Sequence, residues 1–116
     1  MIVTINARDT LRKRKMASYK IGVGERVFCN PPYGRELPKW IEKSYHEAQK
    51  PGTLVVMLIP ARTDTRVFHE YIYGKAEIEF IRGRIKFEGA EYNAPFPSML
   101  VIYGHNGSQQ RANISR

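Results

Sequence analysis

Hydrophobic and polar residues follow two different periods along residues 26–103, and each change of period marks the boundary of an expected element. Residues 26–29 and 53–59 are short apolar runs, which are typical of central strands covered on both faces. Between them, apolar residues recur every three or four positions over 36–49, which predicts an amphipathic helix. The chain therefore begins its ordered part as strand, helix, strand.

Helical spacing returns over residues 64–73, so a second helix is expected there. A side-chain oxygen of Thr63 or Asp64 can accept a hydrogen bond from the first backbone N–H groups, so one of these residues should cap the helix. Gly74 should end it, because glycine readily adopts the left-handed conformation that closes many helices. The expected buried stripe consists of Val67, Phe68, Tyr71 and Ile72.

The remaining segments predict strands. Residues 77–80 and 82–87 alternate between polar and apolar positions, as half-exposed strands do, and residues 98–103 form a last apolar strand. Strand, helix, strand and helix, followed by a strand-rich end, indicate an α/β fold of βαβ units with an antiparallel C-terminal end.

Charge is unevenly distributed along the 116 residues. The formal net charge of +8 favours a polyanionic partner such as nucleic acid, and the alternative is a basic protein without such a partner. Residues 1–20 contain six cations and one anion. We expect residues 1–25 to form an irregular or partly helical basic arm, residues 26–104 to form the α/β domain, and residues 105–116 to form a polar tail.

Several residue types limit the chemistry. No run of 18 apolar residues occurs, so no membrane-spanning segment is expected. The single Cys29 cannot form an internal disulfide, which suits the cytoplasm, and it is expected to be a packed residue rather than a nucleophile. His46, His69 and His105 lack the spacing of metal ligands, so no metal is expected. Phe96, between two prolines, either walls a base pocket or joins the core.

The first strand ends in Asn30-Pro31-Pro32-Tyr33, a sequence suited to holding the amino group of a planar ring. The Asn30 side-chain carbonyl and the Pro31 backbone carbonyl are both acceptors, so together they can take both hydrogens of one NH2 group. The prolines fix the backbone, and Pro32 lacks an N–H that would compete. Tyr33 offers a face on which a base can stack. The alternative is a rigid loop that merely follows a strand.

An ordered set of sequence blocks resembles the phage-type DNA N-6-adenine methyltransferases over roughly residues 26–104. The tetrapeptide alone is less specific, because similar motifs occur in methyltransferases that act on cytosine, guanine or glutamine nitrogen. An RNA or protein glutamine methyltransferase is therefore an alternative. The blocks are Val-Phe-Cys-Asn-Pro-Pro-Tyr-Gly at 27–34, Trp-Ile-Glu-Lys at 40–43, Val-Val-Met-Leu-Ile-Pro-Ala-Arg-Thr-Asp-Thr-Arg at 55–66, Phe-Ile-Arg-Gly-Arg-Ile-Lys-Phe at 80–87 and Ala-Pro-Phe-Pro-Ser at 94–98.

The resemblance implies a Rossmann-like methyltransferase sheet, present here in part, with flanking helices. It implies that Asn30, Pro31, Pro32 and Tyr33 form the catalytic target-amine site. It also implies S-adenosylmethionine as cofactor and double-stranded DNA as substrate, so the expected activity is methyl transfer to the N6 amine of adenine. A phage or prophage origin and the cytoplasm of a bacterial host are expected on the same ground. The resemblance assigns no residue of this chain to cofactor binding.

Members of this family also have an upstream half, which supplies the first strands and the loop that holds the methionine and ribose of the cofactor. About 25 residues precede the motif here, and they do not contain a strand, glycine loop and helix of that type. We therefore expect the chain to match the C-terminal portion of the family. One alternative to the active enzyme is a catalytically inactive, DNA-binding remnant. The other is a half-domain that a homodimer partner or another chain completes through an unpaired strand edge.

Four cations are candidates for contacts with DNA. Arg62 follows the second strand, at the edge where ligands bind in such sheets, although it could instead pair with Asp64. Arg82, Arg84 and Lys86 would share one strand face. Phosphate contacts are the favoured interpretation for these three residues, and a solvated strand face is the alternative.

Overall fold

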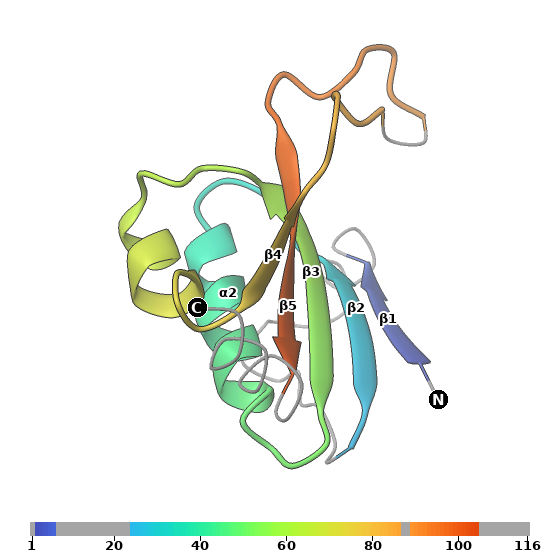
Figure 1. Cartoon of the computed structure of the whole chain (residues 1–116). Coiled ribbons are helices and arrows are strands. Elements are labelled where there is room, and N and C mark those ends of the chain that lie inside the picture. Colours follow the sequence, from blue (N-terminus) through green and yellow to red (C-terminus); the bar gives the residue numbers. More distant parts are fainter. Residues whose placement is uncertain (1, 7–23, 87–88, 105–116) are drawn as a thin grey trace.

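The computed structural model describes residues 2–6, 24–86 and 89–104, and their strands form one mixed five-stranded sheet (Figure 1). The strand order across the sheet is β1-β2-β3-β5-β4. β1, β2 and β3 are parallel, and β5 is antiparallel to both of its neighbours, which confirms the expected α/β class with an antiparallel C-terminal end. The strands are β1 Ile2–Asn6, β2 Arg26–Asn30, β3 Leu54–Pro60, β4 Glu77–Phe80 and β5 Ser98–Gly104.

Alternate residues of the central strands are buried in one core. In β3, Val55, Met57 and Ile59 are buried, and most residues between them are half-buried. The register places Met57 between Cys29 of β2 and Val101 of β5, which are also buried. Since side chains of a strand alternate between faces, these residues share the face on which the helices pack.

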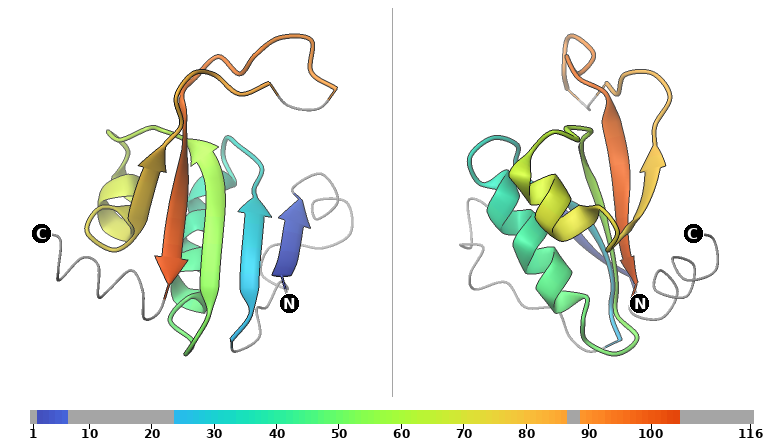
Figure 2. Two further views of the ribbon diagram at one scale, coloured as in Figure 1. Left: turned by 45° about the vertical axis from the view of Figure 1, so that its right-hand side comes forward. Right: turned by 60° about the vertical axis from the view of Figure 1, so that its left-hand side comes forward.

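The two helices of the described residues lie on the same face of the sheet (Figures 1 and 2). α2 (Leu37–Glu47) contains Pro38 in its first turn, where the missing N–H has no helical partner to lose. Its buried side includes Trp40 and Ile41, which join the core. The helix expected over 36–49 is therefore confirmed. In the described part of the chain, neither helix has the length and apolar character needed to span a bilayer.

The second helix, expected over 64–73, is present but shorter, and most of it is a π-helix, η2 (Phe68–Ile72). The Tyr73 N–H donates to the Phe68 carbonyl at 2.8 Å, five residues earlier, which is the wider turn of a π-helix. Phe68 and Ile72 are buried as expected. Gly74, with φ of +78°, follows the helix as expected.

The start of η2 also differs from the expectation that Thr63 or Asp64 caps it. The Thr65 hydroxyl accepts a hydrogen bond from the Phe68 N–H at 3.3 Å and donates to the Arg62 carbonyl at 3.0 Å. The cap lies later because residues 61–64 are used to turn the chain away from β3. Thr65 thereby links the start of the helix to the turn that follows β3.

β1 corrects the expectation for the N-terminal arm, because residues 2–6 form a strand and not an irregular or helical segment. Residues 2–5 are all β-branched, a signal that the basic residues after them obscured. β1 pairs in parallel with β2, and Asn6 lies opposite Asn30. β2 therefore has a strand on each side, so it does not present the unpaired edge expected of a half-sheet.

Residues 82–86 form an exposed loop, so the strand expected over 82–87 is wrong. The Ile81 N–H donates to the carbonyl of Ser98 at 3.0 Å, and β5 begins at that residue, so no described strand continues beyond it for pairing. Gly83 has φ of +81°, which is incompatible with an extended strand. Phe87, most of the expected basic arm and the polar tail lie outside the described residues. After β4 the chain projects past the sheet before it returns as β5 (Figures 1 and 2).

Candidate functional site

Three loops meet at the edge of the sheet where the parallel strands have their carboxyl ends. β2 ends there at Asn30 and continues into the Pro-Pro-Tyr segment, and β3 ends there at Pro60. The loop over residues 81–97 starts and ends at the same edge, because β4 and β3 are both antiparallel to β5. Ligands bind along this edge in sheets of this type, so it is the natural position for a functional site.

Pro31 determines how the ring of Tyr33 is held. If the β2–β3 pairing continued by two residues, Pro31 would pair with Ile59. In a parallel pair the N–H of a residue bonds to the carbonyl one position before its partner, so the Leu58 carbonyl would face the nitrogen of Pro31. That nitrogen has no hydrogen to donate. The Tyr33 hydroxyl donates to this carbonyl instead, at 3.2 Å. Leaving such a carbonyl without a donor would cost about 1–3 kcal/mol. The hydrogen bond therefore anchors the Tyr33 ring over the end of β3.

Phe96 and Arg62 complete an aromatic group around Tyr33. The rings of Tyr33 and Phe96 meet edge to face, with centroids 5.5 Å apart and an interplanar angle of 72°. The Arg62 guanidinium lies 5.6 Å from the centroid of the Phe96 ring, within the range of a cation–π contact. Phe96 therefore contacts the candidate base-stacking residue directly. Among the described residues, no ion pair joins Arg62 to Asp64.

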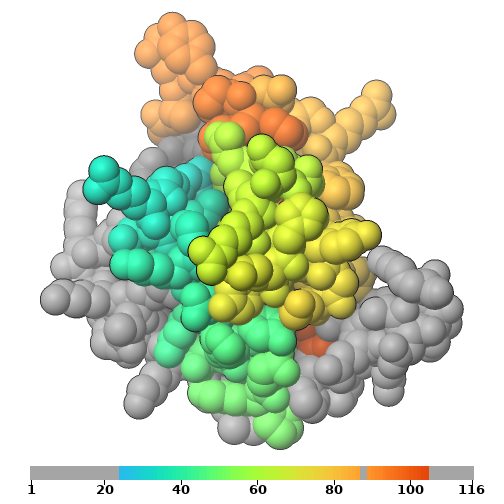
Figure 3. All heavy atoms as spheres, turned by 90° about the vertical axis from the view of Figure 1, so that its left-hand side faces the viewer, coloured from blue at the N-terminus to red at the C-terminus, as the bar shows by residue number. Residues whose placement is uncertain are grey.

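A cavity of about 670 Å³ lies between α2 and η2, with Tyr33 and Phe96 in its wall. Figure 3 faces these two helices and shows them side by side, with the loop over 81–97 above them. The volume is in the range of small-molecule sites. The wall is mainly apolar, and its charged members are Glu42, Arg62, Arg66 and Glu70, of which Arg66 and Glu70 pair at 3.1 Å.

Asn30, Pro31 and Pro32 do not line this cavity. Val27 and Cys29 are buried on the helix side, so the alternation of β2 turns Asn30 towards the opposite face of the sheet. Within the described residues, no hydrogen bond occupies the Asn30 side chain or the Pro31 carbonyl. The structure therefore brings Tyr33, rather than Asn30 or the two prolines, to the cavity.

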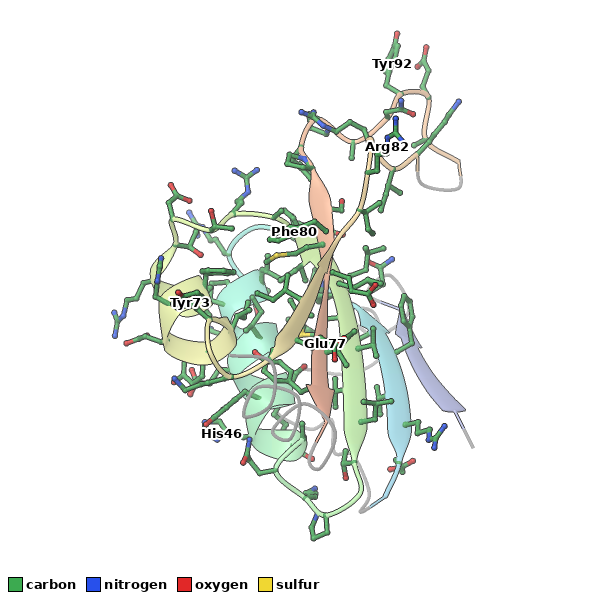
Figure 4. The ribbon with its side chains drawn as sticks, viewed as in Figure 1. His46, Tyr73, Glu77, Phe80, Arg82 and Tyr92 are labelled. Carbon is green, nitrogen blue, oxygen red and sulfur yellow. The ribbon has the colours of Figure 1, made fainter. Side chains whose placement is uncertain are left out.

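The other expected cations lie away from the cavity, on the loop over residues 81–97. Arg82, Arg84 and Lys86 are all exposed, and Figure 4 shows Arg82 on the part of the loop that leaves β4. Because this part of the chain is not a strand, the three cations do not share a strand face. Arg62 borders the cavity, whereas these three residues do not.

Cys29 is a buried thiol, only 1% exposed, in the middle of the core. Burial raises the pKa of the thiol from 9.0 to about 12, so it stays protonated at neutral pH and is a poor nucleophile. This environment confirms the expected packing role. Within the described residues, no three His, Cys, Asp or Glu side chains gather in a way that could hold a metal ion.

The free energy of unfolding should fall as the pH rises above about 9. Burial also raises the pKa of Tyr33, from 10.0 to about 12, so the unfolded chain loses these protons at a lower pH than the folded chain. The thiol alone should remove about 2–3 kcal/mol between pH 9 and 11. Urea unfolding of the wild type and of Cys29→Ala over this range checks the prediction. Equal pH profiles would contradict it, because the variant should show a smaller decrease.

Sequence reasoning missed the anchoring of Tyr33 and the acidic residues of the cavity wall. The anchoring of Tyr33 could have been suspected from the sequence. Pro31 directly follows the strand and has no N–H, so a carbonyl of the neighbouring strand is left without its usual donor. No sequence feature pointed to Glu42 and Glu70 as residues of the cavity wall, because each occupies an ordinary polar position in a helical pattern.

Most of the chain matches one known protein family. The model of the family described as DNA N-6-adenine-methyltransferase (Dam) matches residues 8–113, which is 106 of the 116 residues. Among curated proteins, no significant match was found. The matched range includes the Asn-Pro-Pro-Tyr segment, the cavity and the loop over 81–97.

Proposed function

The chain belongs to the DNA N-6-adenine-methyltransferase (Dam) family, and from this membership we propose that it transfers the methyl group of S-adenosylmethionine to the N6 amine of adenine in double-stranded DNA. The observation that carries the proposal is the Asn-Pro-Pro-Tyr segment at the carboxyl edge of the parallel strands. Within the described residues no hydrogen bond uses the acceptors of Asn30 and Pro31, and the Tyr33 ring that follows them is anchored on Leu58. We also propose that the sheet is of the Rossmann-like methyltransferase class. Its three adjacent parallel strands and the antiparallel β5 between β3 and β4 support this.

The two acceptors act on both hydrogens of the target amine. Asn30 Oδ1 and Pro31 O each accept one N6 hydrogen, which fixes the direction of the nitrogen lone pair. The nitrogen gains positive charge as it forms its bond to the methyl carbon, so its hydrogens become stronger donors. The same two hydrogen bonds are therefore stronger in the transition state than in the ground state, which is the condition for lowering the barrier. After methylation N6 loses one proton to water, and its remaining hydrogen stays hydrogen-bonded to one of these oxygens.

Adenine must leave the base stack before its N6 can reach these oxygens. The Tyr33 ring replaces part of the stacking that the base loses. Its hydroxyl bond to Leu58 and its edge contact with Phe96 hold the ring in place before the base arrives. This preorganisation reduces the entropy lost on binding.

When bound, S-adenosylmethionine supplies an electrophilic methyl group on a positively charged sulfur. An aromatic face and neutral carbonyl oxygens attract a cation of this kind. The described residues therefore fit the reactive end of the cofactor, which Asn30, Pro31 and Tyr33 would border.

Calorimetric titration of the purified chain with S-adenosylmethionine tests whether the site is complete. Saturable binding of one cofactor per chain is the expected result. No saturable binding by folded protein would contradict methyl transfer by this chain alone, and DNA binding without transfer would then be the better description. Sizing of the same sample separates a chain that is complete alone from one that binds the cofactor as a dimer.

Tyr33→Ala should weaken binding of an unpaired adenine in DNA by about 5- to 150-fold, since base–aromatic stacking contributes about 1–3 kcal/mol. Tyr33→Phe keeps the ring and loses the hydrogen bond to Leu58, so it should bind the base nearly as well but unfold about 1–3 kcal/mol more easily. Fluorescence of 2-aminopurine in place of the adenine measures the first effect, and urea unfolding measures the second. Equal losses of base binding in the two variants would contradict a stacking role.

A further inference from the structure

The loop over residues 81–97 carries an exposed aromatic side chain far from the core. Tyr92 is 76% exposed, more than Tyr73 at 66% and Phe80 at 67%, the other large hydrophobic residues that are exposed in the described part of the chain. Figure 4 shows Tyr92 at the outer end of the loop, well beyond the sheet, whereas Tyr73 and Phe80 lie beside the body of the domain. One exposed ring does not by itself indicate a partner, so the interpretation of Tyr92 depends on what surrounds it on the loop.

The base of this loop is held by hydrogen bonds and is not a loose connection. The Ala94 N–H donates to the Ile85 carbonyl at 2.6 Å, which joins the outgoing and returning parts of the loop. The Ala61 N–H donates to the Pro97 carbonyl at 2.9 Å, which ties the returning part to the end of β3. Ala94 is also buried. The direction in which the loop projects is therefore set by the fold.

The loop also carries positive charge towards the side from which DNA would approach the site. Its described residues include the exposed cations Arg82, Arg84 and Lys86 and the single anion Glu91. The returning part contributes Phe96, whose ring contacts Tyr33. A duplex placed against the carboxyl edge of the parallel strands would thus meet the loop and the target-amine site together.

We infer that Tyr92 enters the base stack of duplex DNA while the three cations of the loop hold the neighbouring phosphates; this rests on the proposed function of the chain. Side chains that enter a base step unstack it, and an aromatic ring replaces part of the lost stacking. Cations alone would bind a closed duplex without favouring base extrusion. An aromatic residue at the tip of a cationic loop favours a duplex in which one base has already left.

The test compares an intact duplex with the same duplex containing one abasic site, using the full-length chain and fluorescence anisotropy. A vacant position can accept the Tyr92 ring without the cost of unstacking, so the wild type should bind the abasic duplex about 5- to 150-fold more tightly. Tyr92→Ala should bind both duplexes almost equally. Tyr92→Phe should keep the preference because it keeps the ring.

Two control variants separate stacking from charge and from surface effects. Arg84→Gln should weaken binding to both duplexes by the same factor and preserve the preference. Tyr73→Ala, a matched exposed tyrosine outside the loop, should change neither affinity. A wild type that binds both duplexes equally would overturn this inference, and so would a Tyr92→Ala variant that keeps the preference. Either result would leave the proposed function of the chain intact. Failure of the wild type to bind either duplex would overturn the proposed DNA function as well.

Discussion

Asn30→Ala is expected to lower the rate of methyl transfer to adenine by about 100- to 1,000-fold, the usual effect of removing one preorganised hydrogen-bonding group from an active site. The side chain makes no hydrogen bond within the described residues, so its loss should leave the fold intact. DNA binding should change little, because backbone phosphates supply most of the affinity. Single-turnover transfer of a labelled methyl group measures the effect.

Asn30→Asp is the matched control. A carboxylate keeps an acceptor oxygen at the same position, so this variant should retain far more activity than Asn30→Ala. Circular dichroism and the thermal midpoint should be the same for both variants and the wild type. Full activity of Asn30→Ala would remove this residue from the target-amine site, and equal loss in both variants would show that an acceptor is not what the position supplies.

Replacing Arg82, Arg84 and Lys86 together by glutamine is expected to reduce the salt dependence of DNA binding by about 2.7 units of slope, since each phosphate contact contributes about 0.9. All three side chains are exposed on the projecting loop. A fourfold rise in salt should therefore weaken the wild type about 40-fold more than the variant. Anisotropy titrations of one duplex at several salt concentrations provide the slopes.

The control for this variant removes the same charge elsewhere. Arg26, Lys39 and Lys75 are also exposed cations, and none of them lies on the loop. Replacing these three by glutamine should change the slope by less than about 1. If the two triple variants had the same slope, the effect would be one of net charge, and the loop would not contact phosphates.

The elements that could be predicted from the sequence are those whose apolar pattern is continuous. β2, α2, β3 and β5 each bury one regular set of side chains, so the period of the pattern determined both type and position. The wider turn of η2 was not predictable, because a π-helix and an α-helix bury similar positions over five residues. Residues 82–86 alternate as a strand would, but no described strand lies beside them to supply hydrogen-bond partners, so they form a loop.

The candidate site could be predicted in its chemistry but not in its arrangement. The acceptors of Asn30 and Pro31 and the ring of Tyr33 follow from residue types alone. The contact of Phe96 with Tyr33 depends on how a loop more than 60 positions later returns to the sheet, which no local pattern contains. The position of Tyr92 depends on the same return, and its exposure became visible only with the fold.

The most direct test is to incubate the purified chain with adenine-containing duplex DNA and S-adenosylmethionine that carries a labelled methyl group, and to analyse the digested nucleosides. We expect label in N6-methyladenine, no label in methylated cytosine, and loss of the signal in Asn30→Ala. Absence of N6-methyladenine with folded protein that binds the DNA, or label on another base, would contradict adenine-N6 methyl transfer by this chain.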